Sequence, residues 1–369
     1  MGFFLAAGCP YALKQQNGLP LLPAIRGLTD QVAASMPDGA TRSSMELAQA
    51  CLNADGNAVP DIEHILTFVR SLKEVVGPAG EVRGFSKAAL ESLDLAICCR
   101  IADIVNINLP AGNTAFDQLS RWIGSIPRGY PAEIFTTNYD LLIEQALERH
   151  RVPYFDGFVG VRDAFFDQRA IDDDSLPPRW ARLWKLHGSI NWELDAAGSV
   201  TRRNDSDSAK SRLIHPSHLK YTESRRMPYL AMIDRMRFFL RQPSAVIIIS
   251  GYSFRDEHLN EIFLQGVQGN VTAVVFALQH GELGAYPAAV ALAEASQNFN
   301  VLSTTEAIIG GDRAPWRLRQ SGAQPETRFS TFWRSDDGTT EELVSGQFLL
   351  GDFSSLGSFL EAFVSRRAL

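Results

Sequence analysis

The sequence predicts an α/β fold built on a doubly wound, mostly parallel sheet. Residues 244–250 and 270–278 are β-branched apolar runs, typical of strands that are buried on both faces. Shorter strand-like segments begin at residues 2, 183 and 299. Apolar residues at helical spacing follow the segments that end near residues 137 and 250. This alternation of strand and helix favours a parallel sheet with helices on both faces.

Composition and charge limit the class of protein. The chain has 369 residues, of which 45% are hydrophobic and 21% charged, as in ordinary globular domains. No apolar run approaches the roughly 20 residues of a membrane span, and the apolar residues 1–7 lack the basic region of a signal peptide. The formal net charge of −7 gives no general attraction to nucleic acid. We therefore expect a cytoplasmic protein with no membrane association and no strong direct nucleic-acid binding.

The cysteines predict neither a zinc site nor a disulfide framework. Only Cys9, Cys51, Cys98 and Cys99 occur, and no two form a C-x-x-C pair. Neighbouring residues on a helix cannot chelate one metal, so Cys98 and Cys99 are expected to be buried as small apolar groups. No zinc is expected.

The first predicted strand ends in a turn of small residues. Ala6, Ala7, Gly8 and Cys9 precede Pro10, and a helical segment follows. Small residues let a backbone approach a pyrophosphate, so this stretch can be a phosphate-binding turn. Such turns also use small residues simply for packing, and both interpretations stay open.

Residues 41–123 carry only helical patterns, with no strand pattern between them. We interpret this stretch, about 41–125, as a helical insertion between the first two strands of the sheet. An insertion at this place can supply oligomer contacts or a lid. His64 lies on it and is expected to be a surface or packing residue.

Polar residues follow the strand-like segment that ends at Phe135. Thr136, Thr137 and Asn138 lead through Tyr139 and Asp140 into an amphipathic helix. Ligands of open α/β sheets bind at the carboxyl ends of the strands, so Asn138 is placed to face one. The alternative is that Asn138 or Asp140 only caps the helix.

A second polar turn follows residues 183–186, where His187 precedes Gly188 and Ser189. His187 is predicted to lie at the same edge of the sheet as Asn138, although a single histidine can equally be structural. Further on, Arg235, Arg237 and Arg241 define a basic amphipathic helix. It can contact phosphate, but its charges are expected to face solvent.

A third turn follows residues 244–250 and begins with Gly251 and Tyr252. Ser253 and Asp256 have the spacing of a capping box for the next helix. Several connecting segments are also predicted: residues 154–174 are loop-rich with a solvated acidic run at 172–174, residues 201–211 form a loop, Asp336-Asp337-Gly338 forms a hairpin turn, and residues 356–364 form a closing helix.

Together, the three turns resemble the motifs of the sirtuin superfamily, in particular the bacterial sirtuin-like proteins of antiphage defence. Thr136-Thr137-Asn138-Tyr139-Asp140 is similar to the family's asparagine motif, Lys185-Leu186-His187-Gly188-Ser189 to its catalytic histidine motif, and Gly251-Tyr252-Ser253-Phe254-Arg255-Asp256 to its later cofactor-side loop. Residues 216–221 and 350–353 are also similar to segments of the defence branch, so the resemblance covers most of the chain. The first turn departs from the family's Gly-Ala-Gly-x-Ser, because Ala6 replaces a glycine and Pro10 the serine.

The resemblance implies a Rossmann-like fold that binds NAD. It implies a sirtuin-like NAD-binding domain at 1–305 and, packed on it, a C-terminal extension at 306–369 with a β-hairpin and a helix. Because the four-cysteine module of deacylating sirtuins is missing, it implies NAD hydrolysis to nicotinamide and ADP-ribose. The implied catalytic residues are Asn138 and His187, and the implied cofactor-binding residues are Ala6, Ala7, Gly8, Cys9, Thr136, Asp140, Gly251 and Ser253.

Other roles are compatible with the same motifs. A non-catalytic module that senses NAD or ADP-ribose is favoured by the altered first turn, and an assembly subunit is favoured by the large insertion. The resemblance further implies a homo-oligomer that acts in abortive infection by depleting NAD. Its implied partner is a HerA-type hexameric ATPase, with an Argonaute-like protein as the alternative. The first strand begins almost at residue 1, so no upstream regulatory domain is expected.

Overall fold

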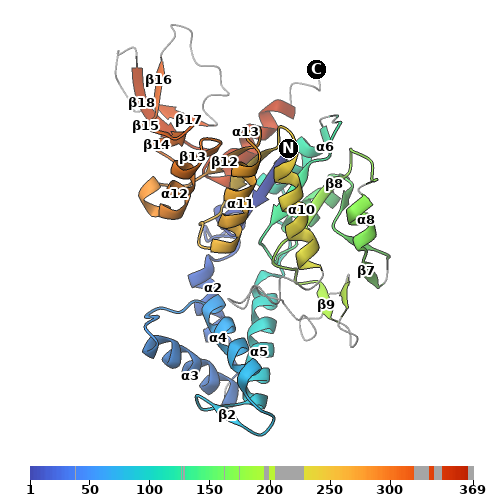
Figure 1. The fold of residues 1–369 in the computed structure, drawn as a ribbon, viewed down its shortest axis with the longest axis vertical. Helices are drawn as coiled ribbons and strands as arrows, with labels where there is room; N and C mark the ends of the chain where they lie inside the picture. Colours follow the sequence, from blue (N-terminus) through green and yellow to red (C-terminus); the bar gives the residue numbers. More distant parts are fainter. Residues whose placement is uncertain are drawn as a thin grey trace.

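The predicted α/β class with a mostly parallel sheet is confirmed. The computed structural model describes residues 1–364 except for residues 38, 126, 128, 162, 174, 195–198, 204–227, 320–331 and 336–342. Nine strands form the central sheet in the order β15-β14-β13-β12-β11-β1-β4-β8-β5 (Figure 1). Their bounds are β1 (Gly2–Leu5), β4 (Glu133–Thr136), β5 (Tyr154–Phe155), β8 (Ala181–Lys185), β11 (Val246–Ser250), β12 (Val274–Leu278), β13 (Phe299–Leu302), β14 (Glu306–Ile309) and β15 (Asp312–Pro315). Pairing is parallel from β5 to β13 and antiparallel only at β14 and β15.

The central strands are buried on both faces because successive side chains enter two different cores. Phe3 and Leu5 of β1 belong to one hydrophobic core, whereas Phe4 between them belongs to the other. All four residues of β1 are buried, as are all four of β4. This explains why the strands appear in the sequence as short continuous apolar runs.

Helices cover both faces of the sheet (Figure 1). On the face of Phe3 lie α1 (Gly8–Ala12), α6 (Ala115–Ser125), α7 (Leu142–Arg149) and α13 (Phe353–Val364). On the face of Phe4 lie α8 (Gln168–Asp173), α10 (Tyr229–Arg241), α11 (Glu257–Gly269) and α12 (Pro287–Ala295), with the short 3₁₀ helix η1 (Leu283–Ala285) before α12. The predicted closing helix corresponds to α13, which packs against α6 through Gly357, where a Cβ atom would lie 2.7 Å from Cα of Ala115.

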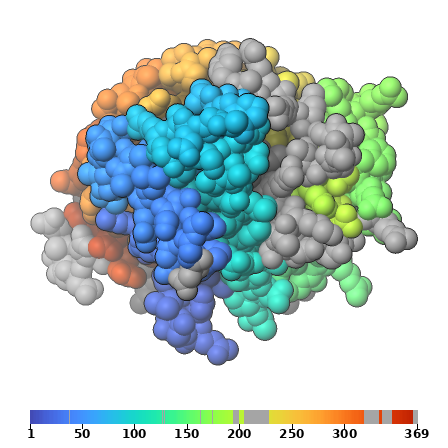
Figure 2. Space-filling model, turned by 90° about the horizontal axis from the view of Figure 1, so that it is seen from below, coloured from blue at the N-terminus to red at the C-terminus, as the bar shows by residue number. Residues whose placement is uncertain are grey.

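The stretch between β1 and β4 is helical, as expected, with one exception. It contains α2 (Ile25–Ala34), α3 (Ala40–Ala54), α4 (Ile62–Val75) and α5 (Lys87–Val105), which lie below the sheet in Figure 1 and at the front of Figure 2, coloured blue to cyan. The expectation that no strand interrupts these helices is wrong, because β2 (Glu81–Val82) and β3 (Phe85–Ser86) form a hairpin. Arg83 and Gly84 turn the chain with φ of +49° and +83°. Two-residue strands are too short to show an alternating pattern.

Two small sheets complete the fold. The first contains β6 (Phe158–Val159), β7 (Ala164–Phe166), β9 (Trp192–Leu194) and β10 (Val200–Arg202), in the order β6-β7-β10-β9. The segments predicted as loops at 154–174 and at 201–202 are therefore partly strands. Packing stabilises this sheet, because the rings of Phe158 and Trp192 have centroids 5.1 Å apart. Asp172 and Asp173 are exposed, as predicted, whereas Asp174 and residues 204–211 and 216–221 lie outside the described residues.

The second small sheet has the order β16-β18-β17, from β16 (Arg317–Arg319), β17 (Trp333–Ser335) and β18 (Leu343–Phe348). The turn predicted at Asp336-Asp337-Gly338 lies outside the described residues, and the strands on either side of it pair antiparallel. No helix in the described part of the chain is long and apolar enough to cross a membrane.

The expectation that the basic helix faces solvent is wrong for Arg235. Its side chain is buried in α10, where Nη2 lies 3.0 Å from Oε1 of Glu133 and the guanidinium stacks 5.4 Å from the ring of Trp184. Trp184 donates its indole N–H to the same carboxylate. The charge is therefore paired inside the core at the amino end of β4, whereas Arg241 is exposed.

Candidate functional site

Four neighbouring strands deliver the three predicted motifs and the first turn to one edge of the sheet. In the order β11-β1-β4-β8, Leu5 is level with both Ser250 and Thr136, and Thr136 is level with Lys185. The chain proceeds from β1 to β4 and β8 on one side, then returns to β11 and β12 on the other. The strand order thus reverses between β1 and β11, and open α/β sheets bind ligands in front of such a reversal.

At this reversal, two glycines bring the turns after β1 and β11 into backbone contact. Gly8 donates its N–H to the carbonyl oxygen of Gly251 at 2.9 Å. A Cβ atom on Gly8 would lie 2.5 Å from Cα of Gly251, and Gly251 has a φ of +69°. Both positions therefore require glycine. With no side chains on Gly8 and Gly251, their backbones lie next to each other at the carboxyl-end edge of the sheet.

Most backbone N–H groups of the turn after β1 already have hydrogen-bond partners within the protein. The N–H of Ala6 donates to the carbonyl of Ser250 at 3.1 Å, and that of Cys9 to the carbonyl of Ala6 at 2.8 Å. Gly8 is bonded to Gly251, and Pro10 has no N–H. Within residues 6–10, all of which the structure describes, the N–H of Ala7 alone has no hydrogen-bond partner. It is the backbone donor that this turn can offer a phosphate.

The side chain of Cys9 is part of the packing rather than a reactive group. It is fully buried, and Sγ donates to the carbonyl of Ser250 at 3.3 Å. Burial raises the pKa of this thiol to about 12, so the group is neutral at physiological pH.

Asn138 is held by hydrogen bonds on its backbone and its side chain. Its N–H donates to Oγ1 of Thr136 at 3.0 Å, and that hydroxyl donates to the carbonyl of Leu5 at 2.7 Å. Nδ2 of Asn138 donates to the carbonyl of Ala6 at 3.3 Å. The side chain is half-buried, and among the described residues no donor reaches its Oδ1. Thr136 thus holds the turn after β4 in place, and Oδ1 of Asn138 is a fixed hydrogen-bond acceptor at the edge of the sheet.

Asp140 supports the start of α7, although the N-cap residue of that helix is Leu141 and not Asn138 or Asp140. Its Oδ1 accepts the N–H of Leu142, the first residue of α7, at 3.0 Å. The carboxyl group is buried, which raises its pKa, while the nearby charge of Lys185 acts in the opposite direction. Asp140 therefore stabilises the junction between the turn after β4 and helix α7.

His187 follows β8 directly and lies beside a carboxylate from the β11 turn. Its Nε2 is 3.4 Å from Oδ2 of Asp256, and its side chain is 13% exposed. Gly188, with a φ of +95°, turns the chain immediately after it. The histidine is therefore accessible at the edge while a fixed negative group flanks one ring nitrogen.

The capping box predicted for Ser253 and Asp256 is wrong. Asp256 is the cap of α11, and its Oδ1 accepts the N–H groups of His258 and Leu259 at 3.0 and 3.3 Å. The backbone of Phe254 has a φ of +58°, so the helix cannot begin before it. Ser253 is exposed and has no hydrogen bond to the described residues, which leaves its hydroxyl free for a ligand.

Two polar side chains at this edge were missed by the sequence interpretation. Oγ of Ser250 and Nε2 of Gln279 are buried at the ends of β11 and β12, and neither has a hydrogen-bond partner among the described residues. Buried polar groups are nearly always paired, so these two are available to a ligand. Polar residues that end a β-branched run were the signal that could have identified them.

The helical insertion approaches the same edge. Burial raises the pKa of Tyr139 and of Tyr252. The carboxylate of Glu63 in the first turn of α4 raises both further, although the charge of Asp256 contributes more at Tyr252. The two tyrosines belong to the turns after β4 and β11, so one carboxylate acts on both. Tyr139 also packs against the hydrophobic core to which α4 contributes Ile62 and Ile65.

No metal centre is found in the part of the chain that the structure describes, where no group of three or more His, Cys, Asp or Glu side chains could hold an ion. None of the four cysteines, all of which the structure describes, forms a disulfide. Cys98, as predicted, is buried in α5, whereas Cys99 is half-buried.

A comparison with protein families finds a match over part of the chain. The model of a SIR2-like domain matches residues 132–298, a stretch that contains Asn138, His187 and Gly251 but not β1 and its turn. No curated protein matches the chain significantly. The match supports the resemblance to the sirtuin-like superfamily and implies that NAD is involved in the function. The glycine contact and the unpartnered groups of Ser250 and Gln279 fit a dinucleotide at this edge.

Proposed function

We propose that this protein hydrolyses NAD to nicotinamide and ADP-ribose. The observation that carries the proposal is the placement of Asn138 and His187 at the ends of the neighbouring parallel strands β4 and β8. Both lie on the edge where the glycine contact marks the reversal of strand order. The SIR2-like match over the same strands is compatible with an enzyme that acts on NAD.

The edge offers a complementary group for each part of the dinucleotide. Ser250 and Gln279 would hold the adenosine half, since their polar atoms need partners. The N–H of Ala7 and the hydroxyl of Ser253 would hold the pyrophosphate beside the glycine contact. The nicotinamide ribose would then lie toward β4 and β8.

The reaction would depend on geometry more than on acid catalysis. The nicotinamide leaving group is cationic in NAD, so the glycosidic bond breaks with oxocarbenium character and without protonation of the leaving group. Oδ1 of Asn138 would orient the ribose and the attacking water. His187 would accept a proton from that water or a ribose hydroxyl, an effect typically worth about 10²–10⁴ in rate. Water is the proposed acceptor because the cysteines of the chain do not build the zinc module of deacylating sirtuins.

The test is release of nicotinamide from NAD by the purified protein, alone and with the products of its neighbouring genes. Asn138→Ala and His187→Ala should each lower the rate by about 10² or more while the melting temperature stays near that of the wild type. Asn53→Ala, at an exposed position on α3, is the matched control and should leave the rate unchanged. Equal rates for the wild type and both site variants would refute the assignment.

A non-catalytic module that senses NAD or ADP-ribose is the second candidate. It is favoured by the turn after β1, where one backbone N–H remains for a phosphate. A sensor would bind NAD, with a measurable heat in calorimetry, but would release no nicotinamide under any condition.

We further propose a role in antiphage defence by NAD depletion, as a homo-oligomer gated by a HerA-type ATPase or an Argonaute-like protein. An ungated NAD hydrolase would drain the cofactor of the cell, so control by assembly is needed. Leu47, Val75 and Leu95 on helices of the insertion are exposed apolar side chains that could serve in such contacts. Light scattering of the chain alone and with its neighbour decides this: a monomer that ignores the neighbour and hydrolyses NAD at full rate would refute it.

A further inference from the structure

Lys185, the last residue of β8, places a buried ammonium group between two corners of the candidate site. Its side chain is 3% exposed. Nζ donates to the carbonyl of Asp140, to Oε1 of Glu144 at 2.9 Å, and to the carbonyl of Tyr139 at 3.4 Å. The three N–H groups of the ammonium thus have three acceptors, all in the segment that follows β4.

The carbonyl of Tyr139 is the point where the two corners are joined. Besides Lys185, it accepts the N–H of Ile190 at 3.1 Å and the hydroxyl of Ser189 at 3.5 Å. All three donors come from the segment that contains His187, and the acceptor directly follows Asn138. The distance between the two proposed catalytic residues is therefore fixed through this peptide group.

The charge of Lys185 compensates the two buried carboxyl groups beside it, those of Asp140 and Glu144. Asp140 and Glu144 are both buried, which raises the pKa of each, and the charge of Lys185 opposes that rise. Oε2 of Glu144 has no partner among the described residues. The only cation that the structure shows beside these two carboxyl groups is Lys185. The ammonium group of Lys185 is therefore held in a single geometry, because an unpaired buried charge is very unfavourable.

We propose that Lys185 is the positioning residue of this site, which ties the corner of Asn138 to the strand end of His187. The inference rests on the proposed NAD hydrolysis for its kinetic consequences only. The side chain of Lys185 is buried, whereas Asn138 and His187 are partly exposed, so Lys185 acts through these two residues. A displacement of about 1 Å between reacting groups can cost about 100-fold in rate without a comparable loss of binding.

The kinetic test replaces Lys185 by methionine. Methionine has a side chain of similar length, but it lacks the charge and all three hydrogen bonds. Lys185→Met should lower kcat for nicotinamide release by about 10- to 100-fold and leave KM for NAD nearly unchanged. In the Asn138→Ala background the same substitution should cost little more, because the residue that it positions is gone. A full additional loss in that background would refute positioning through Asn138.

Arg235→Met is the matched control. It removes another buried cation, paired with Glu133 at the opposite end of β4, and so should lower stability by a similar amount. Its kcat per folded molecule should equal that of the wild type. If Arg235→Met lowers kcat as strongly as Lys185→Met, the effect is one of general stability and the proposal fails.

A readout that does not need activity separates this inference from the proposed function. The side-chain amide resonance of Asn138, identified by its loss in Asn138→Ala, should shift in Lys185→Met and stay in place in Arg235→Met. If the wild type releases no nicotinamide but the resonance shifts in Lys185→Met, NAD hydrolysis is refuted and the positioning role is retained. An unshifted resonance refutes the positioning role. If Lys185→Met does not fold, Lys185→Gln replaces it, and failure of both to fold would make Lys185 a folding residue and overturn the proposal.

Discussion

The carboxylate of Asp256 serves two partners at once, with Oδ2 lying 3.4 Å from Nε2 of His187 and Oδ1 capping helix α11. One side chain thereby couples the turn after β11 to the proposed base after β8. The two roles can be separated by substitution, because asparagine caps helices about as well as aspartate but carries no charge.

Asp256→Asn should therefore retain the melting temperature and lower kcat for nicotinamide release by about tenfold, since His187 loses its charged neighbour. Asp256→Ala should show the same kinetic loss and, in addition, a fall of about 1 kcal/mol in the free energy of unfolding. Denaturant unfolding and initial rates measure the two effects. Normal kinetics in Asp256→Asn would show that the contact with His187 has no catalytic consequence.

Gly8→Ala should destabilise the protein by about 1–3 kcal/mol, because the new methyl group meets the backbone of Gly251 and not a flexible side chain. Gly269→Ala, at the end of α11 where no atom lies within 4 Å, is the control and should be neutral or slightly stabilising. Urea unfolding of both variants checks this. Equal stability of the two would mean that the turns after β1 and β11 can separate freely.

Gln279→Leu should have opposite effects on the free protein and on ligand binding. Removing a buried polar group that lacks a partner should leave the free energy of unfolding unchanged or higher. If Nε2 holds the adenosine half, the affinity for NAD should fall by about tenfold, since a lost hydrogen bond costs about 1–3 kcal/mol. Calorimetric titration with NAD measures the affinity, and an unchanged Kd would remove Gln279 from the site.

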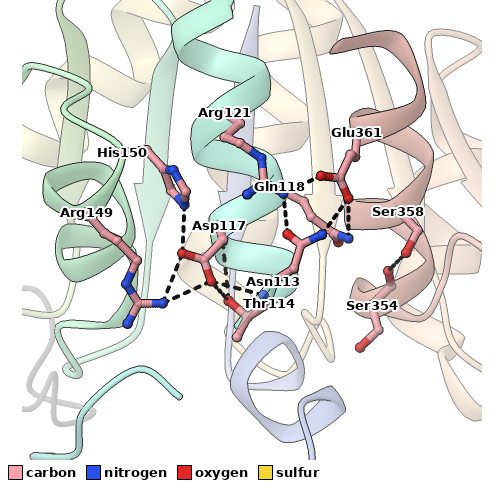
Figure 3. Close-up of polar contacts among 10 residues, drawn as sticks. All are labelled: Asn113, Thr114, Asp117, Gln118, Arg121, Arg149, His150, Ser354, Ser358 and Glu361. Atoms are coloured by element: carbon pink, nitrogen blue, oxygen red, sulfur yellow. Dashed lines mark hydrogen bonds and ion pairs between the residues drawn. The ribbon is translucent and has the colours of Figure 1, made fainter. Parts of the chain in front are cut away.

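Asp117 on α6 makes stability depend on acid pH. Its buried carboxylate accepts hydrogen bonds from Thr114 and lies within hydrogen-bond distance of both Arg149 and His150 (Figure 3). Burial alone would raise its pKa, but the bonds from Thr114 and His150 and the charge of Arg149 together lower it. A lowered pKa contributes stability above the ordinary value of about 3.9, and this contribution is lost as the pH falls through the folded-state pKa.

Asp117→Asn should therefore destabilise the protein by about 1.5–3 kcal/mol near neutral pH, and the difference from the wild type should shrink below about pH 4. Unfolding by denaturant at several pH values measures the difference. A penalty that is constant with pH would show that the charge of Asp117 contributes nothing.

Removal of metal should have no effect on stability. The four cysteines form no disulfide and lie in α1, α3 and α5, at spacings that cannot form a zinc module. Elemental analysis is expected to find no stoichiometric zinc, and a chelator should leave the melting temperature unchanged. Stoichiometric zinc together with unfolding on chelation would contradict this.

The parts of the fold that could be predicted are those with local signals. Strand β11 and the turn at Gly251 show as a β-branched run followed by glycine, and the corners of Asn138 and His187 show as polar residues after apolar ones. The hairpin of β2 and β3 and the small sheet of β6, β7, β9 and β10 are built from strands of two or three residues, too short for a periodic signal.

What could not be predicted depends on partners that are distant in the sequence. Arg235 was expected in solvent because its partner Glu133 is 102 residues away. The bonds of Lys185 to Tyr139 and Asp140 span about 46 residues and have no sequence pattern. Ser253 was expected to cap α11 because its spacing fits, but the positive φ of Phe254 delays the helix to Glu257. In each case tertiary contacts decided the outcome.

The central position of β1 has a consequence for the order of folding. Gly2 pairs with Glu133 on one side and with Ile247 on the other, so this interior strand of the sheet must wait for partners far along the chain. At about 5–20 residues per second, the ribosome supplies β11 more than about ten seconds after β1. Until then the apolar segment Gly-Phe-Phe-Leu lacks one neighbouring strand, and an unpaired apolar strand edge is prone to aggregation. The contact between Gly8 and Gly251 cannot form earlier, so the proposed dinucleotide site is incomplete until β11 is in place.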